Sequence, residues 1–244
     1  VHETHGKYDV VPWYPPDSHE HRAREHLDDW SMARGVRSGK FTQRDYDFTK
    51  PGANLEVVSR IAKAHAQAEF EQYSYPGGYS EVQKGEAIAR TRLESLQADH
   101  EVLGGRGNAR GMIPGFLFTL ELFPRDDQNR EYLITHVTHS LHQGGYDSGG
   151  ADSGDDFEYG CSLRAMPSSE PYRPPCITRR PVVHGPQTAF VVGEAGEEIW
   201  TNEHGQVKVQ FHWDREGQSN QDSSCWVRVS QAWAGKQWGA QFLP

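Results

Sequence analysis

A proline-rich stretch, EPYRPPCITRRPVVHGP, constrains this chain more than any other feature of its sequence. Its five prolines cannot donate backbone hydrogen bonds, and each fixes its own φ angle at about −65°. The stretch is therefore expected to run extended, outside any helix or central strand. We interpret residues 171–186 as a linker between one domain at residues 1–170 and a second at residues 187–244.

The composition favours a mainly β chain with minor α content. A length of 244 residues suits one large domain or two ordinary ones. Apolar residues make up only 35% of the chain, glycine and proline are plentiful, and helical periodicities are few. Because a low apolar content limits burial per residue, we expect oligomerisation to supply further buried surface.

The formal net charge of −9 argues against a non-specific nucleic-acid binder, which needs a basic face to displace counterions. Arg106, Arg110 and Arg125 are scattered and form no basic cluster in the sequence. We therefore expect no nucleic acid among the partners.

Cysteine usage and the chain's start bear on its compartment. Cys161, Cys176 and Cys225 are widely spaced, which indicates neither a zinc knuckle nor a disulfide scaffold and fits a reducing compartment. No run approaches the roughly 18 apolar residues of a membrane helix. The start, VHETHGKYDV, has no signal-peptide pattern and no initiator Met. We expect a piece of a longer protein that is cytoplasmic and, if exported, leaves without a signal peptide.

Local patterns predict the elements of the first domain. Prolines 12, 15 and 16 indicate a surface excursion without regular structure in residues 1–25. Residues 53–72 have helical spacing at Leu55, Val58 and Ile61, and YSYPGGY is expected to form a turn. Strands are predicted at residues 30–36, 41–48, 116–123, 132–142 and 159–166.

The clearest helix is predicted at residues 85–101, where Ala89, Leu93 and Leu96 form one apolar stripe. Glycines 104, 105 and 107 are expected to end this helix. Residues 144–156, GGYDSGGADSGDD, are read as a low-complexity loop.

The second domain has the sharper strand pattern. A strand is predicted at residues 188–192, and Val207, Val209 and Phe211 are expected to be buried while Lys208 and Gln210 face outward. Residues 225–230 also alternate. Three or four short strands indicate a small β-barrel or sandwich that lacks strands, so we expect the natural protein to continue past Pro244.

Several motifs resemble one family. The run from QTAFVVGEAGEEIW to WAGKQWGAQFLP, residues 187–244, resembles the OB-fold segment of VgrG spike proteins of bacterial type VI secretion systems. Upstream, RDYDFTKPGANL, YSYPGGY, DQNREYLITHVTHSL and YRPPCITRRPVVHGPQTA resemble stretches of the family's hub region, in the same order. The match covers nearly the whole chain.

The resemblance implies a phage-hub-like β-barrel domain without its N-terminal part, then an incomplete OB-fold barrel truncated before the family's β-helix. It implies a homotrimer that connects the Hcp tube to the needle and a PAAR tip, carries effector or adaptor proteins, and contacts the target membrane transiently. Such a protein is cytoplasmic before firing and is then secreted or delivered into a target cell.

Histidine clusters were considered as metal sites. His2-Glu3-Thr4-His5 has H-E-x-H spacing, whereas a zincin needs H-E-x-x-H on a helix. His136, His139 and His142 fall on different faces of a strand. A denser group is interpreted as a solvated polar loop, and it comprises His19, Glu20, His21, Glu25 and His26.

Other motifs differ in spacing or in structural context from the functional motifs that they resemble. Ser148 and Ser153 sit one place late for a G-x-S-x-G elbow, and the glycines after residue 103 follow a predicted helix instead of preceding one. Carboxylates 194, 197, 198, 203, 214 and 216 are expected to be solvated in turns. Tryptophans 200, 213, 226, 233 and 238 are expected in a core and subunit interface. We thus predict a non-enzymatic protein with no catalytic, cofactor-binding or metal-binding residue.

Two alternatives stay open. One is a cell-wall hydrolase like phage spikes that carry a lysozyme domain, although the sequence leaves no room for such an insertion. The other is an OB-fold oligonucleotide binder, for which the tryptophans would stack on bases.

Overall fold

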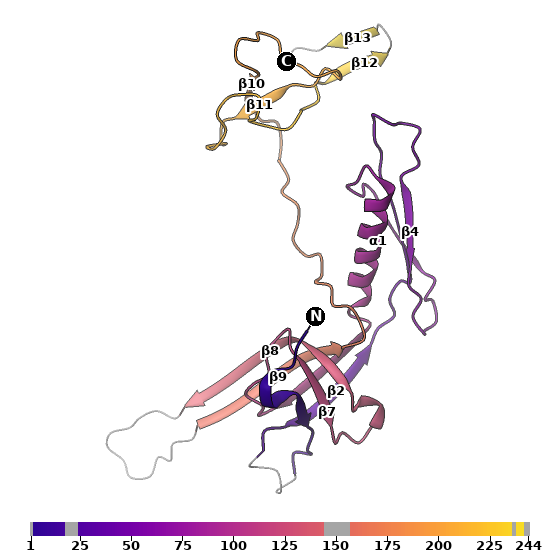
Figure 1. The fold of residues 1–244 in the computed structure, drawn as a ribbon, viewed down its shortest axis with the longest axis vertical. Helices are drawn as coiled ribbons and strands as arrows, with labels where there is room; N and C mark the ends of the chain where they lie inside the picture. The colour runs from indigo at the N-terminus through magenta and orange to yellow at the C-terminus, as the bar shows by residue number, and fades with distance from the viewer. Residues whose placement is uncertain (1, 18–23, 144–156, 236–237, 242–244) are drawn as a thin grey trace, which may run out of the picture. The chain divides into compact units, whose positions relative to one another are not determined.

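The computed structural model describes residues 2–17, 24–143, 157–235 and 238–241 of the chain, apart from the side chains of residues 231–244. The chain is mainly β, with one α-helix among the described residues. It forms two compact units, residues 1–177 and 178–244 (Figure 1).

The first unit is built on a six-stranded sheet with the strand order β1-β7-β8-β9-β6-β2. All neighbouring pairs are antiparallel except β1 and β7, which run parallel. The strands are β1 (Val10–Pro12), β2 (Leu27–Arg34), β6 (Glu101–Gly107), β7 (Leu117–Glu121), β8 (Glu131–Gln143) and β9 (Phe157–Pro167).

The two edges of this sheet meet. Trp13 follows β1 and forms a parallel bridge with Leu27 of β2. The Trp13 amide donates to the Glu121 carbonyl of β7 at 2.8 Å, and the Tyr14 amide donates to the Leu27 carbonyl at 2.9 Å. The sheet is therefore curled, and its concave face encloses the main hydrophobic core.

That core consists of side chains from every strand of the curled sheet. Leu27, Leu103, Phe118 and Tyr132 are fully buried there, and the Trp30 ring lies against Phe118 and Tyr132. Alternation along each strand places these residues on one face, since successive side chains point to opposite sides. The tyrosine keeps its polar end satisfied because its hydroxyl donates to the Gln128 carbonyl at 2.8 Å.

The expected surface excursion at residues 1–25 is wrong for part of its length. A 3-10 helix at Gly6–Tyr8 leads into β1, where Val11 is buried. Prolines do not prevent this strand because β1 lies at the edge of the sheet order, where a missing donor costs little.

A smaller α/β substructure is inserted in the chain between β2 and β6. It comprises a three-stranded sheet, in the order β4-β3-β5, and a helix that packs on one face of it (Figure 1). The elements are β3 (Lys40–Arg44), β4 (Glu56–Arg60), β5 (Glu71–Ser74) and α1 (Val82–Gln97). Phe41, Val57 and Leu93 meet in its small core.

The helical spacing at residues 53–72 gave a wrong prediction. The segment contains β4 and leads into β5, and Leu55 and Val57 are buried while Glu56 and Val58 are exposed. The β-branched valines favour an extended backbone. In a strand, alternate side chains face the same side, so Leu55 and Val57 can both pack against α1.

The helix prediction is confirmed with a shift: α1 begins at Val82, ends at Gln97 and buries Ala89 and Leu93. The glycines at 104, 105 and 107 do not end it, because they lie inside β6. A Cβ on Gly107 would approach the His26 carbonyl oxygen at 2.0 Å, so this glycine permits the close approach of β2.

The second unit contains two small antiparallel sheets among its described residues. They comprise β10 (Ala189–Val192) with β11 (Lys208–Phe211), and β12 (Gln231–Gly235) with β13 (Trp238–Gln241). The predicted alternation in residues 225–230 yields a bridge between Val207 and Val227, with no strand assigned there.

The predicted burial in β11 is only partly right. Val209 is buried, but Gln210 is buried too, and Val207 and Phe211 are half-buried. The Gln210 amide donates to the Asp214 carbonyl at 3.0 Å and its oxygen accepts from the Ser219 amide at 3.2 Å. The Gln210 side chain can therefore be buried, because it makes hydrogen bonds to backbone groups of the residues that follow β11.

The loop expected at residues 144–156 lies outside the described residues. In the described part of the chain, no helix combines the length and the apolar character needed to cross a bilayer.

We predict that Gly107→Ala lowers the free energy of unfolding by about 1–3 kcal/mol, because the new Cβ collides with backbone atoms of residues 26 and 27. Gly160→Ala in β9 is the matched control, since its Cβ meets nothing within 4 Å. Urea titration of both variants checks this. Equal stability of the two variants would contradict the packing argument.

Candidate functional site

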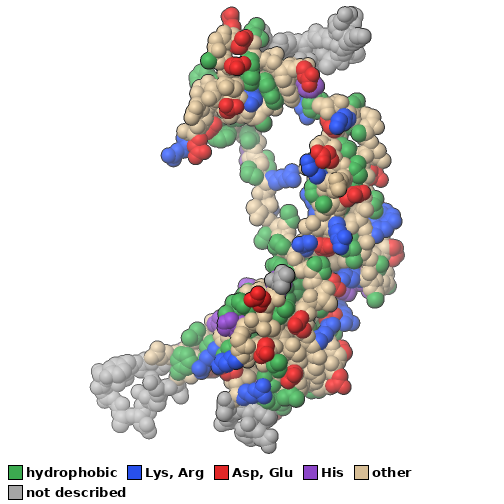
Figure 2. All heavy atoms as spheres, in the orientation of Figure 1, with side chains coloured by type: hydrophobic (Ala, Val, Ile, Leu, Met, Phe, Trp, Pro, Cys, Tyr) green, Lys and Arg blue, Asp and Glu red, His purple; other side chains and the backbone are tan. Residues whose placement is uncertain are grey.

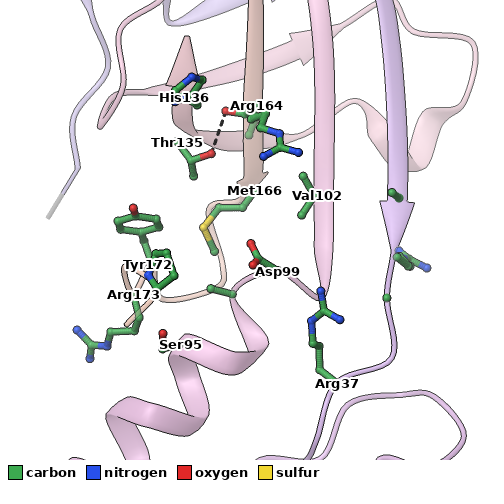
Figure 3. A pocket seen from close by; sticks show the side chains of 16 residues that line it. Arg37, Ser95, Asp99, Val102, Thr135, His136, Arg164, Met166, Tyr172 and Arg173 are labelled. Atoms are coloured by element: carbon green, nitrogen blue, oxygen red, sulfur yellow. Dashed lines mark hydrogen bonds between the residues drawn. The ribbon is translucent and has the colours of Figure 1, made fainter. Parts of the chain in front are cut away.

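A groove of about 660 Å³ lies in the first unit, beside the C-terminal end of α1 (Figure 3). Strands β2, β6, β8 and β9 supply one side, and the segment that follows β9 supplies another. Its charged lining comprises Arg34, Arg37, Arg164 and Arg173 with the single carboxylate of Asp99.

Two of these arginines are held by buried glutamates. The Nε atom of Arg34 donates to Glu101 Oε2 at 2.7 Å, and the Nε atom of Arg173 donates to Glu94 Oε2 at 2.8 Å. Both carboxylates are buried and each has a second arginine partner: Arg130 for Glu101 and Arg90 for Glu94. Burial of these charges is therefore compensated by paired hydrogen bonds.

The other two arginines are differently placed. Arg37 donates through Nη1 to the carbonyl of its neighbour Val36 at 3.2 Å, and Arg164 lies opposite His136 in the β8–β9 register. Neither guanidinium contacts a carboxylate in the described part of the chain. Both stay available to an anion in the groove.

The segment after β9 is attached to the first unit by polar contacts. Lys63 pairs with Glu170 at 2.6 Å, and the Ser95 hydroxyl of α1 donates to the Pro174 carbonyl at 3.0 Å. Together with the contact between Arg173 and Glu94, these bonds place the segment as a wall of the groove.

The pKa of Glu94 reflects two opposed causes. Burial acts to raise the pKa of this carboxyl, but hydrogen bonds from Arg90 and Arg173 outweigh burial and hold the pKa below its ordinary value. The folded protein therefore keeps Glu94 ionised and paired at neutral pH.

The histidine motif at the start of the chain does not form a site. His2 Nδ1 lies 2.9 Å from the Gly115 carbonyl, whereas the His5 ring stacks on Tyr8 and contacts the edge of Phe116. The two rings thus serve different local contacts.

In the denser cluster, His19, Glu20 and His21 lie outside the described residues. The Glu25 carboxylate accepts from the Tyr8 hydroxyl and from the Arg110 amide, and His26 Nδ1 contacts the Arg24 carbonyl. Over residues 2–17, 24–143, 157–235 and 238–241, no three His, Cys, Asp or Glu residues converge as metal ligands.

The histidines of β8 do not converge with other possible ligands in the described part of the chain. His136, His139 and His142 are exposed along β8, and His139 Nδ1 lies 2.6 Å from the Tyr159 hydroxyl. Burial raises the pKa of Tyr159 to about 12, so this hydroxyl stays protonated at neutral pH. Ser148 and Ser153 lie outside the described residues.

The carboxylates of the second unit are mostly solvated, as predicted. The side chains of Glu194, Glu197, Glu198, Glu203 and Glu216 are exposed. Asp214 is half-buried, and hydrogen bonds from the amides of Glu216 and Gly217 lower its pKa.

The tryptophans divide into different environments. Trp200 and Trp226 are half-buried and stacked with ring centroids 4.7 Å apart, and Lys208 Nζ lies over the Trp226 ring at 5.3 Å. Trp213 is 66% exposed and stacks on Phe211. The side chains of Trp233 and Trp238 are outside the described set.

Sequence reasoning did not identify the arginine groove. Its arginines occur at positions 34, 37, 164 and 173, far apart along the chain. No local motif connects such positions, so only folding brings them to one groove.

Comparison with known proteins gives two kinds of match. Residues 2–145 match the family model of the phage tail baseplate hub (GPD). Two spike proteins of the Pseudomonas aeruginosa type VI secretion system are similar over all of the chain: VgrG1b at 52% identity and VgrG1a at 51%. The chain spans 32% and 38% of their lengths, respectively.

A solved structure is also similar. The E. coli c3393 protein, described as a component of the type VI secretion system, aligns with a TM-score of 0.43 at 19% identity. The alignment covers 77% of this chain and 49% of that chain.

We predict that Glu94→Gln costs about 1–3 kcal/mol at neutral pH because two charge-assisted hydrogen bonds are weakened. A lowered folded-state pKa stabilises the protein above the unfolded-state pKa, and this contribution is lost as pH falls through the folded value. The variant should therefore lose stability less steeply than the parent below about pH 4.5.

Chemical denaturation over an acidic pH series measures this difference. Glu86→Gln, at an exposed position of the same helix, is the control and should follow the parent protein. Parallel pH curves for the parent and Glu94→Gln would contradict the assignment.

Proposed function

Since the chain belongs to the phage tail baseplate hub family and, over its whole length, to the VgrG spike proteins, we propose that it is a structural part of a type VI secretion puncturing device. The observation that carries the proposal is the identity of 52% to VgrG1b across all 244 residues. A rigid protein that couples mechanical parts needs enclosed cores and specific contact surfaces. The curled sheet of the first unit supplies one such core.

In this proposal residues 1–170 are the hub-like domain, residues 171–186 are the linker and residues 187–244 are an incomplete OB-fold segment. The linker assignment is supported by its backbone, since residues 171–186 are outside any helix or strand and are exposed. The hub assignment is supported by the family match at residues 2–145.

The protein would act as a homotrimer that links the Hcp tube to the β-helical needle and a PAAR tip. Effector or adaptor proteins would travel with it, and it would contact the target membrane transiently. Exposed large apolar side chains in the second unit support further contacts, and they include Phe190, Val191, Ile199 and Trp213. It would reside in the cytoplasm before firing, be delivered into a target cell, and carry no catalytic residue, metal or cofactor.

The surface charge does not favour the oligonucleotide-binding alternative. On the face seen in Figure 2, acidic and basic side chains are interspersed and form no long basic stripe. A face of this kind does not favour counterion release along a nucleic acid.

We predict that the complete natural protein is a trimer, because family membership and the low apolar fraction both point to burial between subunits. Multi-angle light scattering at micromolar concentration measures the mass. A stable monomer of the complete protein would contradict the prediction.

We further predict that Glu197→Ala and Glu203→Ala leave both stability and export of the tube protein unchanged, because both carboxylates are exposed. A complementation assay for tube-protein export, beside a thermal melt of each variant, checks this. An export defect in a variant of normal stability would reveal a docking or chemical role that the proposal denies.

A further inference from the structure

We propose that the arginine groove beside α1 binds a carboxylate-rich, extended peptide segment of a partner protein. This goes beyond the proposed function, which assigns no binding site to these residues. The argument starts from the charge of the groove. Its lining contains four arginines and one carboxylate, in a chain whose net charge is −9. A local excess of cations on an acidic chain favours an anionic partner.

Two of the cations are pre-organised. Arg34 and Arg173 meet their glutamates through Nε, which leaves the terminal nitrogens of each guanidinium to donate elsewhere. Because the glutamates already hold these side chains, binding a ligand costs less conformational entropy than ordering free arginines would. A planar guanidinium also matches the two oxygens of a carboxylate.

Two further cations lie at separate places along the groove. Figure 3 shows Arg164 and Arg37 apart from each other, with Val102 and Met166 between them. Neither guanidinium contacts a carboxylate among the residues that the structure describes. A ligand that satisfies both must therefore carry more than one negative group, with spacing between them.

The uncharged lining favours a peptide over a small inorganic anion. Side chains of Ala33, Val102 and Pro175 offer apolar contact to the side-chain methylene groups of a peptide. The volume of about 660 Å³ lies within the range of pockets that bury a small ligand. One phosphate would occupy a fraction of this space and reach few of the arginines.

The test uses the 244-residue chain and a fluorescein-labelled hexaglutamate peptide, with labelled hexaglutamine as the neutral probe. Fluorescence anisotropy should show saturable binding of hexaglutamate that weakens as salt is raised. Arg37→Ala and Arg164→Ala should each weaken binding by about ten-fold, since each removes a charge-assisted hydrogen bond.

Two further variants control for charge and position. Asp99→Asn should tighten binding, because it removes the carboxylate that opposes the ligand in the groove. Arg125 lies outside the groove and pairs with Asp127. The Arg125→Ala variant should therefore bind hexaglutamate as the parent does. Thermal melts of all four variants verify that each is folded.

Three results would overturn the proposal. One is equal binding of hexaglutamate and hexaglutamine. Another is an Arg125→Ala variant as weak as the groove variants. The third is displacement of hexaglutamate by inorganic phosphate or a single-stranded oligonucleotide at an equal or lower concentration, which would identify a general anion surface. None of these results bears on the trimer, which light scattering measures separately.

Discussion

The contact between Trp13 and Leu27 brings the two edges of the main sheet together. An open six-stranded sheet would leave one face of its core to solvent and two edges free to pair with other chains. Here the residues that follow β1 bond to β7 on one side and to β2 on the other. The curl encloses Leu27, Phe118 and Tyr132, and this core is the support on which β6, β8 and β9 present the groove.

Two buried glutamates each form ion pairs with two arginines that reach the surface. Glu101 begins β6 and joins Arg34 of β2 to Arg130, while Glu94 of α1 joins Arg90 to Arg173 beyond β9. An arrangement of the elements that separated such a pair would leave a buried charge without a partner, which costs stability. Each contact therefore favours the one arrangement in which both partners meet. The pair of Glu94 and Arg173 both holds the segment after β9 against α1 and orients one arginine of the groove. In the proposed peptide binding, Arg173 would therefore have a structural role and a binding role.

The sequence predicted several elements well, although the segment with the sharpest alternation, residues 207–213, was only partly right. Strands β8 and β9 and the helix α1 were identified from their patterns, and the family resemblance followed from ordered motifs along the chain. The failures have a common cause. In residues 53–72 and in Gln210, a neighbouring element decided the outcome, by packing of α1 on Leu55 and Val57 or by the turn that satisfies the glutamine amide. The glycines of β6 were misread because close approach between strands cannot be seen in one segment.

The sequence by itself determined the mainly β character, the extended proline-rich stretch and the family, because these depend on local backbone restriction, side-chain period and ordered motifs. Tertiary structure decided where the edges of the sheet meet, which polar side chains are buried and which charges share a groove. Arg34, Arg37, Arg164 and Arg173 come together only because β2 and β9 lie on either side of β6. That proximity is a property of strand order, and no local pattern in the chain encodes it.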